Sequence, residues 1–453
     1  MRIKTILLAI LILASLTGNS KVAFTPPKSW LKILFVGYDP AQAMPTSVRK
    51  IPGNMTKEGF EREYPIRMPA FKALLSEYFA EVKTIDCRDW KPSDSDPYDV
   101  TIFDFPTKII EPVTEGVKYL PADFSKPVVF ISHTAPQMGT PIGLKFEWLC
   151  LCLDADAHHL NRKHSIFKGP LEKVKPTMVM KPTPEGVYHY ASGDNVPKQI
   201  PMWRVDQKGY IEDKDARIGL VSRGDRFTDS PDTELISSGV NTKDVNAVAL
   251  GRHGNFFLWG FGASPAGMTE EGKKVFVNVV AYMSKFDKKT PIARKLNDRA
   301  ATTDYFKEMQ SMVKRMYETS TAKKDGKPVP TWDEYLKNQK GFFTRFGTDS
   351  ANYQYLKDNI DYMYCDPKGF YSAVIDEEAK IIGVPNHDLR FLETCIKMFK
   401  QNDRPELALK MLKKYTAENF DDADKWQSWY TNNKKRLFFT EAPYKFIVNT
   451  YNQ

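Results

Sequence analysis

The sequence predicts an α/β fold with a mainly parallel sheet flanked by helices, followed by a mostly α-helical C-terminal domain. Apolar runs recur at 31–36, 100–103 and 127–132, which is typical of strands covered on both faces. An amphipathic helical pattern at 65–81 separates the first two of these runs. The segment 244–286 then reads as strand, turn, strand, glycine-rich loop and helix. This alternation of strands and helices is characteristic of an α/β domain.

The remaining elements of this first domain follow from the same patterns. Strands are expected at 31–36, 82–85, 100–103 and 127–132, with further candidates around Val179 and at 187–190 and 218–221. Residues 144–153 are expected to form a short buried helix. The stretch 171–240 is therefore predicted to be rich in strands but irregular.

The segment 244–286 closes the domain. The run 245–250 predicts a buried strand and 256–259 its partner, with a turn at 251–255 between them. Thr269 is the expected N-cap of the last helix, and the two glutamates after it lie where the helix dipole favours negative charge. Apolar residues then repeat at helical spacing, so this helix is expected to pack on the core.

The composition changes after residue 287. The predicted organisation is a signal peptide at 1–20, an α/β domain at 29–288, a helical linker at 289–330 and a mostly helical domain at 331–453. Helices are expected at 304–318, 387–400 (with Asn386 as its cap), 405–415 and 422–433, and a hairpin from 437–439 and 444–448.

The start of the chain has the pattern of a secretory signal peptide. A short basic stretch precedes the apolar residues 6–14, and mostly small and polar residues follow up to 20. The apolar run is too short to span a bilayer comfortably, although a membrane anchor remains the alternative. We expect a secreted or periplasmic protein, with no transmembrane helix in the mature chain.

Charge and cysteine content narrow the expected partners. The net charge of +9 does not indicate nucleic-acid binding, because the lysines alternate with acidic residues over a mildly basic surface. The five cysteines are an odd number, so at least one is free or pairs between chains. Cys150 and Cys152 are too close in sequence to bridge without strain. We therefore expect buried thiols and a protein stabilised by its core.

One loop contains the densest group of candidate metal ligands. Asp154, Asp156, His158 and His159 lie within six residues, and carboxylate and imidazole are suitable donors for zinc or a similar metal. The spacing matches no known metal signature, so a polar loop without a metal is the alternative.

Polar residues at strand ends form a second group of candidates. Asp104 and His133 each follow a predicted parallel strand, and crevices in open α/β sheets lie beyond the carboxyl ends of strands. A histidine there can act as a general acid or base, so both are candidate catalytic residues. Arg252 and His253 in the predicted turn, together with Trp203, are candidate binding residues; for the first two a turn without a binding role is the alternative.

Three segments resemble the trehalose-utilisation (ThuA-like) family: LKILFVGYD near the start, His164-Ser-Ile-Phe-Lys-Gly169, and the hairpin GRHGNFFLWGF. The resemblance covers about residues 30–288. It implies a class I glutamine-amidotransferase-like fold, adds His164 to the candidate catalytic residues, and suggests an association with carbohydrate metabolism. The glycine-flanked cysteine of the amidotransferases is absent, so glutaminase activity is not expected.

Three functions remain open from the sequence. The first is an exported protein that binds or modifies a carbohydrate near His133, Asp104 and the loop 154–164. The second is a non-catalytic module that interacts with a protein partner. The third is a metal-dependent hydrolase that uses the Asp/His loop. The sequence assigns no cofactor and leaves open whether the protein is an enzyme.

Overall fold

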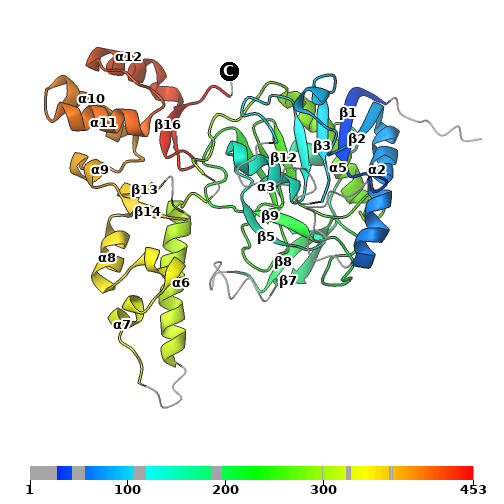
Figure 1. Cartoon of the computed structure of the whole chain (residues 1–453), viewed down its shortest axis with the longest axis horizontal. Coiled ribbons are helices and arrows are strands. Elements are labelled where there is room, and N and C mark those ends of the chain that lie inside the picture. Colours follow the sequence, from blue (N-terminus) through cyan, green and yellow to red (C-terminus); the bar gives the residue numbers. More distant parts are fainter. Residues whose placement is uncertain are drawn as a thin grey trace, which may run out of the picture.

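The structure is a computed structural model that describes residues 28–42, 57–106, 119–184, 196–297, 299–322, 328–366, 369 and 371–451. Figure 1 shows an α/β part and a mostly helical C-terminal part side by side. The predicted signal peptide and the predicted strand at 187–190 lie outside the described residues. Within the described residues, no helix is both long enough and apolar enough to cross a bilayer.

A mixed ten-stranded sheet forms the centre of the α/β part, with the strand order β2-β1-β3-β4-β12-β11-β10-β6-β8-β7. Its strands are β1 (Ser29–Gly37), β2 (Phe79–Asp86), β3 (Val100–Phe103), β4 (Val128–Ile131), β6 (Asp156–His158), β7 (Met178–Pro182), β8 (Gln199–Arg204), β10 (Thr233–Gly239), β11 (Leu250–His253) and β12 (Phe256–Trp259).

The sheet is mixed, not mainly parallel as the sequence predicts. The strands from β2 to β12 in this order pair in parallel, whereas every pair from β12 to β7 is antiparallel. The tight turn between β11 and β12, at Gly254 with φ 59°, explains part of this difference. Strands joined by so short a turn must run antiparallel, because a parallel neighbour needs a long crossover.

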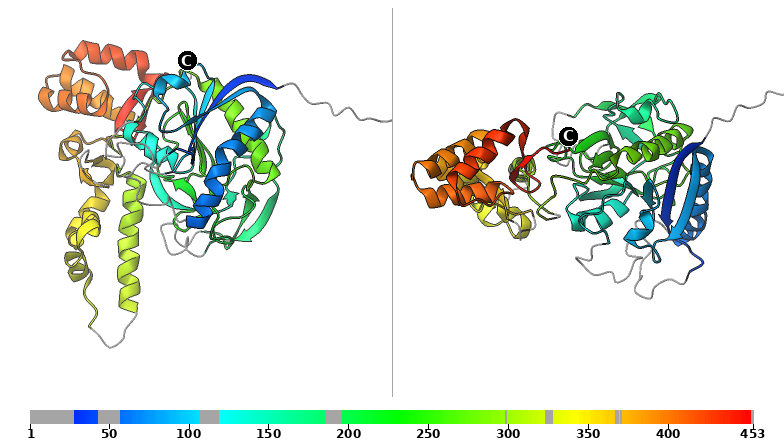
Figure 2. Two further views of the ribbon diagram at one scale, coloured as in Figure 1. Left: turned by 45° about the vertical axis from the view of Figure 1, so that its right-hand side comes forward. Right: turned by 90° about the horizontal axis from the view of Figure 1, so that it is seen from above.

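Helices cover one face of the parallel half. Helices α2 (Lys57–Tyr78) and α5 (Glu270–Met283) lie side by side on this face, as Figure 1 and the turned views of Figure 2 show. Alternate residues of β1 face opposite sides: Ile33 and Phe35 belong to the core beneath these helices. Leu34 and Val36 belong to the core on the other face, with the short helix α3 (Thr134–Gly139). The period of two along the strand thus builds both cores.

Two predictions near residue 150 are wrong. The expected helix at 144–153 is instead strand β5 (Trp148–Leu153), which pairs with β9 (Gly219–Ser222) in a separate two-stranded sheet. A short, continuously apolar run has no periodicity that separates a buried helix from a buried strand. Cys150 and Cys152 on β5 form a disulfide. The other cysteines, Cys87, Cys365 and Cys395, are buried and free.

The C-terminal part is mostly helical, with two small hairpins. Its helices are α6 (Thr303–Ala322), α7 (Trp332–Lys337), α8 (Ser350–Asp358), α9 (Glu377–Ile382), α10 (Leu389–Lys400), α11 (Pro405–Tyr415) and α12 (Ala423–Asn433), and its strands are β13 (Met363–Cys365), β14 (Ala373–Ile375), β15 (Leu437–Thr440) and β16 (Lys445–Val448). Helices α10 to α12 and the hairpin β15–β16 share one apolar core, and α6 packs in another. Pro405 is the first residue of α11, and Asp422 caps α12.

Candidate functional site

The structure brings Asp104 and His133 to the same edge of the sheet. Asp104 follows β3 and His133 follows β4, and both side chains are buried. Two arginines join them. Arg67 of α2 forms a bidentate pair with Asp104 at 2.8 and 3.1 Å, and Arg217 donates to Asp104 at 2.7 Å and to Nδ1 of His133 at 3.3 Å. Sequence reasoning missed both arginines, which lie far along the chain from the residues they hold.

This network leaves neither candidate available for proton transfer. Burial acts to raise the pKa of Asp104, but the charges and hydrogen bonds of Arg67 and Arg217 outweigh it and lower the pKa to about 2. Burial, and then the charge of Arg217, lower the pKa of His133 to about 3. Its Nε2 donates to the carbonyl of Phe105 at 2.8 Å, so the Nδ1 lone pair is the one that accepts from Arg217. Both nitrogens of His133 are therefore engaged by protein groups, and neither is free to take a proton in this arrangement.

Two other polar residues at this edge have atoms without a hydrogen-bond partner in the described part of the chain. Ser132 Oγ is buried, and its residue has φ 54° at the turn from β4 into α3. Asp206 accepts from the Ala263 amide at 3.2 Å through Oδ2, but Oδ1 has no partner. Burial raises the pKa of Asp206 to about 7. Ser132 has no base within hydrogen-bond distance in this part of the chain, so the turn holds no activated nucleophile.

His164 lies in a different place, beside Glu234 and Arg252. Glu234 accepts from Arg252 Nε at 2.7 Å, from Tyr282 at 2.8 Å and from His164 Nε2 at 3.4 Å. Arg252 belongs to strand β11, not to the predicted turn, and it is 2 % exposed. Its guanidinium also donates to Tyr451, which follows β16. Arg252 is thus held by the Glu234 carboxylate, by the Tyr451 hydroxyl and by backbone carbonyls of the chain.

The two remaining predicted binding residues are also inside the fold. His253, on β11 and not in a turn, accepts from the Lys145 amide through Nδ1 at 3.1 Å and faces Asp232 at 3.4 Å through Nε2. Trp203 of β8 is fully buried and donates to Glu271 at 2.8 Å. Neither side chain offers a surface to a ligand.

The candidate metal ligands of the loop from Asp154 to His159 do not gather into one group of donors in the described residues. Asp156 is held by Lys181 at 2.8 Å and by Arg204 at 3.5 Å, while Asp154 accepts from the Ile211 amide at 3.2 Å. The two histidines face each other, with Nδ1 atoms 2.7 Å apart. No group of three or more suitable donors converges anywhere in the described residues. These side chains pair with cations, amides and each other instead of sharing one centre.

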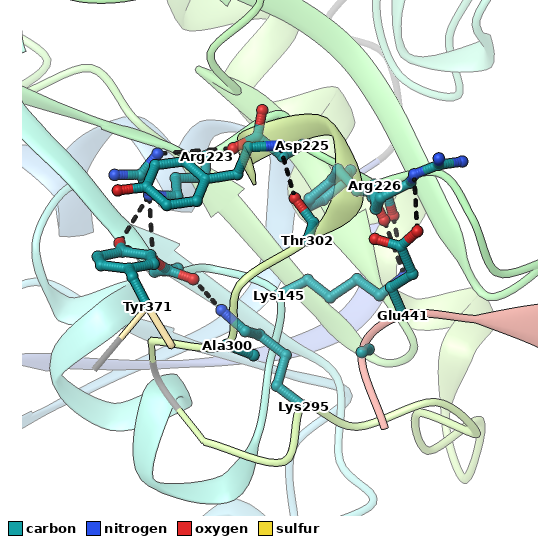
Figure 3. Close-up of a pocket in the computed structure, with 13 residues that line it drawn as sticks. Lys145, Arg223, Asp225, Arg226, Lys295, Ala300, Thr302, Tyr371 and Glu441 are labelled. Carbon is teal, nitrogen blue, oxygen red and sulfur yellow. Dashed lines mark hydrogen bonds and ion pairs between the residues drawn. The ribbon is translucent and has the colours of Figure 1, made fainter. Parts of the chain in front are cut away.

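A charged pocket lies where the two parts of the molecule meet (Figure 3). Arg223 packs against the neighbouring rings of Tyr305 and Tyr371, 4.7 Å from each centroid, and pairs with Glu147 at 3.1 Å. Glu147 also accepts from Lys295. Burial raises the pKa of the nearby Asp225 to about 6. The free volume is only about 30 Å³, which holds a water molecule or two, so this cluster joins the domains and does not receive a ligand.

A larger cleft opens beside this pocket, again between the two parts, with a free volume of about 340 Å³. Arg226 and Asp229 line it from the α/β side. The C-terminal side contributes Thr303, Lys307, Ile360, Asp361, His387, Phe439 and Glu441.

The side chains of Lys307 and Asp361 in this cleft are exposed and form no hydrogen bond or ion pair within the described residues. The ring of His387 lies 6.2 Å from that of Phe439. The cleft thus combines a free cation, a free carboxylate and an aromatic ring. We call this set of residues the interdomain cleft. Sequence reasoning missed it, because its residues are spread from 226 to 441.

Comparison with known proteins gives a distant structural likeness. No family model matches the chain, and no curated protein matches it at a significant level. A ThuA-like protein from Bacteroides uniformis ATCC 8492 matches over 58% of this chain and 96% of its own, with 11% identity and a TM-score of 0.33. Its description agrees with the resemblance seen in the sequence, but a likeness this weak defines neither the fold nor an activity.

Proposed function

We propose that the protein is an exported carbohydrate-binding protein whose ligand occupies the interdomain cleft. The proposal rests on one observation: the cleft is large enough for a small ligand and is lined in part by polar side chains without a partner in the described residues. A cleft of about 340 Å³ accommodates a small ligand, and such sites occur preferentially at domain interfaces. Lys307 and Asp361 are free to bond with hydroxyl groups, and the ring of Phe439 suits the apolar face of a sugar.

The same geometry argues against catalysis by the predicted histidines. His133, His164 and His253 lie in separate environments, and His158 and His159 contact each other. An enzyme needs its acid, base and reacting atoms within hydrogen-bond reach of one site. We therefore assign the protein a binding role and no chemical step.

Calorimetric titration with a panel of monosaccharides and short oligosaccharides tests the proposal. For a sugar that binds the wild type, we expect Asp361→Asn and Lys307→Ala each to weaken binding about tenfold or more, because a hydrogen bond to a charged group contributes about 1.5–3 kcal/mol. Asp123→Asn and Lys72→Ala change the same residue types at exposed positions outside the cleft and should leave the affinity unchanged.

Either of two results would contradict the cleft as the site. One is that no sugar in the panel binds, and the other is that the cleft variants bind like the wild type. Chromatography of the sugar after incubation checks the absence of chemistry, since an altered sugar would show that the protein is an enzyme.

Export is tested separately. We expect the protein produced in a bacterial host to appear in the periplasm or medium with residues 1–20 removed, because they have the composition of a signal peptide. Intact mass and cell fractionation measure this, and an uncleaved protein in the cytoplasm would contradict it.

A further inference from the structure

The disulfide between Cys150 and Cys152 spans a single intervening residue of strand β5. In a regular strand, positions two apart are separated by about 6.6 Å, near the upper limit for a disulfide. Here the two Cα atoms are 5.2 Å apart. The pairing of β5 with β9 is irregular on both sides of Cys150. The irregular pairing of β5 with β9 therefore accompanies the short distance between the Cα atoms of Cys150 and Cys152.

This bond contributes little as a structural crosslink. It closes a loop of three residues, and so short a loop restricts the unfolded chain much less than a long one does. Both cysteines also lie on the same strand, so the bond joins no two elements of the fold. Stabilisation of the domain does not explain its presence.

The five cysteines differ in their access to solvent. Cys150 and Cys152 are 8 % and 7 % exposed, whereas Cys365 and Cys395 are 0 % exposed and Cys87 is 1 % exposed. Burial raises the pKa of the Cys87 thiol well above its ordinary range and that of Cys395 to about 12. All five cysteines are buried, but Cys150 and Cys152 are the least so, and we expect a thiol reagent to reach them before a free cysteine.

Strand β5 begins at the junction between the two parts of the molecule. Glu147, the residue before the strand, accepts from Lys295 and Tyr371 of the C-terminal side. The carbonyl of Trp148, the first residue of the strand, accepts from Arg299 at 3.0 Å. A change in the path of β5 must therefore displace groups that hold the two parts together.

We propose that Cys150–Cys152 is a redox site that is reversibly reduced by a dithiol, and that its state is transmitted through β5 to the domain junction. One thiolate of the dithiol attacks a sulfur of the disulfide and releases the other cysteine as a thiolate. The second thiol of the reductant, once deprotonated, then displaces the first cysteine. Two electrons pass to the protein, the reductant leaves as its own disulfide, and the two cysteines take up the two protons. Reduction allows β5 to extend toward regular strand geometry.

Thiol counting tests the redox site without any ligand, so its outcome is independent of the proposed carbohydrate binding. In protein purified without reductant and then denatured, we expect three reactive thiols, and five after full reduction. Mild dithiothreitol treatment of the folded protein, followed by alkylation and peptide mass spectrometry, should label Cys150 and Cys152 first. Five thiols before reduction, or a bond that reduces only on unfolding, would overturn the proposal.

Hydrogen exchange of the oxidised and reduced wild type tests the transmission step. On reduction we expect slower exchange in Trp148–Leu153, because its ladder with β9 becomes regular, and faster exchange around Arg299, with helix α10 unchanged as the internal reference. The Cys150→Ser/Cys152→Ser variant should resemble the reduced protein and lose its response to dithiothreitol. If that variant does not fold, the wild-type comparison decides alone, and identical exchange of β5 in both states would refute the coupling.

Discussion

Asp104 and Asp206 are buried carboxyl groups at the same edge of the sheet, yet their pKa values move in opposite directions. Burial acts on both to favour the neutral form. For Asp104 the two bound guanidinium groups outweigh burial, and its pKa falls to about 2. Asp206 receives only backbone amide hydrogen bonds and weaker charge effects, and its pKa rises to about 7. Whether each buried carboxyl group is charged thus depends on the group that hydrogen-bonds to it and not on its depth of burial.

Asp206→Asn is expected to stabilise the protein at alkaline pH. The folded protein keeps the Asp206 proton up to about pH 7, while the unfolded chain releases it near 3.8. The folded state thus binds more protons between these values, and its stability falls as the pH rises through them. At 1.36 kcal/mol for each pH unit, the variant should gain at most about 4 kcal/mol at pH 8 and nothing near pH 3. Urea unfolding at both pH values measures the difference.

Asp104→Asn is the matched control at this edge and should act in the opposite direction. It leaves Arg67 and Arg217 buried without their shared carboxylate, which costs about 3–5 kcal/mol when a buried pair loses one partner. The stability due to ionised Asp104 is present above the unfolded pKa of 3.8 and is lost as the pH falls through about 2. A gain at pH 8 in this variant, or none in Asp206→Asn, would contradict the assignment.

Helix α5 and strand β5 show which features of the local sequence are sufficient to predict an element. Helix α5 has an N-cap, acidic residues in its first turn and a wide apolar stripe, and it forms as the sequence predicts. Strand β5 has a short apolar run with no cap and no clear period, and there the prediction fails. For helix α10 the prediction is correct in part. The helix forms, but its cap is Asp388, while the expected cap, Asn386, donates to the Met363 carbonyl.

Thr269→Ala is expected to destabilise the α/β part by about 1 kcal/mol. The Thr269 hydroxyl accepts from the Gly272 amide at 3.0 Å, and removing an N-cap of this kind leaves that amide without its partner. The hydroxyl also donates to the carbonyl of Val205, the residue directly after β8, at 3.0 Å. Thr269→Ser keeps the oxygen and should retain most of the stability. Thermal unfolding of the three proteins measures this, and equal loss in both variants would contradict a capping role.

At the scale of the whole molecule, the chain returns to the α/β part after the C-terminal hairpin. Tyr451 follows β16 and donates to the Gly254 carbonyl at 3.2 Å. The guanidinium of Arg252 contacts the rings of Phe286 and Tyr451, 4.1 and 5.3 Å from their centroids. Because β15 also carries Phe439 of the interdomain cleft, this contact helps to position one wall of the proposed binding site.

Tyr451→Ala is expected to loosen the junction and lower the stability by about 2–3 kcal/mol, since it removes a buried ring, a cation–π contact and a hydrogen bond. Tyr451→Phe keeps the ring and should lose only about 1 kcal/mol. Calorimetry measures the loss of stability, and limited proteolysis of the segment 287–302 measures the loosening of the junction. Unchanged proteolysis in the alanine variant would mean that the contact does not hold the parts together.

The sequence predicts the sites only in part, because the groups that set the state of a buried side chain lie far from it in the chain. Asp104 and His133 meet because each follows an apolar strand, and such strands end at one edge of a sheet. Their roles do not follow from that position, because Arg217 lies 84 residues from His133 along the chain. Asp206 belongs to no sequence motif, and its raised pKa is due chiefly to burial, which the sequence does not show.

Strand and helix positions, helix caps and the polar residues at strand ends depend on neighbours a few residues apart, so the order of amino acids is enough to infer most of them. The mixed direction of the sheet, the Cys150–Cys152 bond and the interdomain cleft depend on contacts between segments far apart in the chain. A buried charge takes its state from whichever distant group packs against it. Only the folded arrangement decides which group that is.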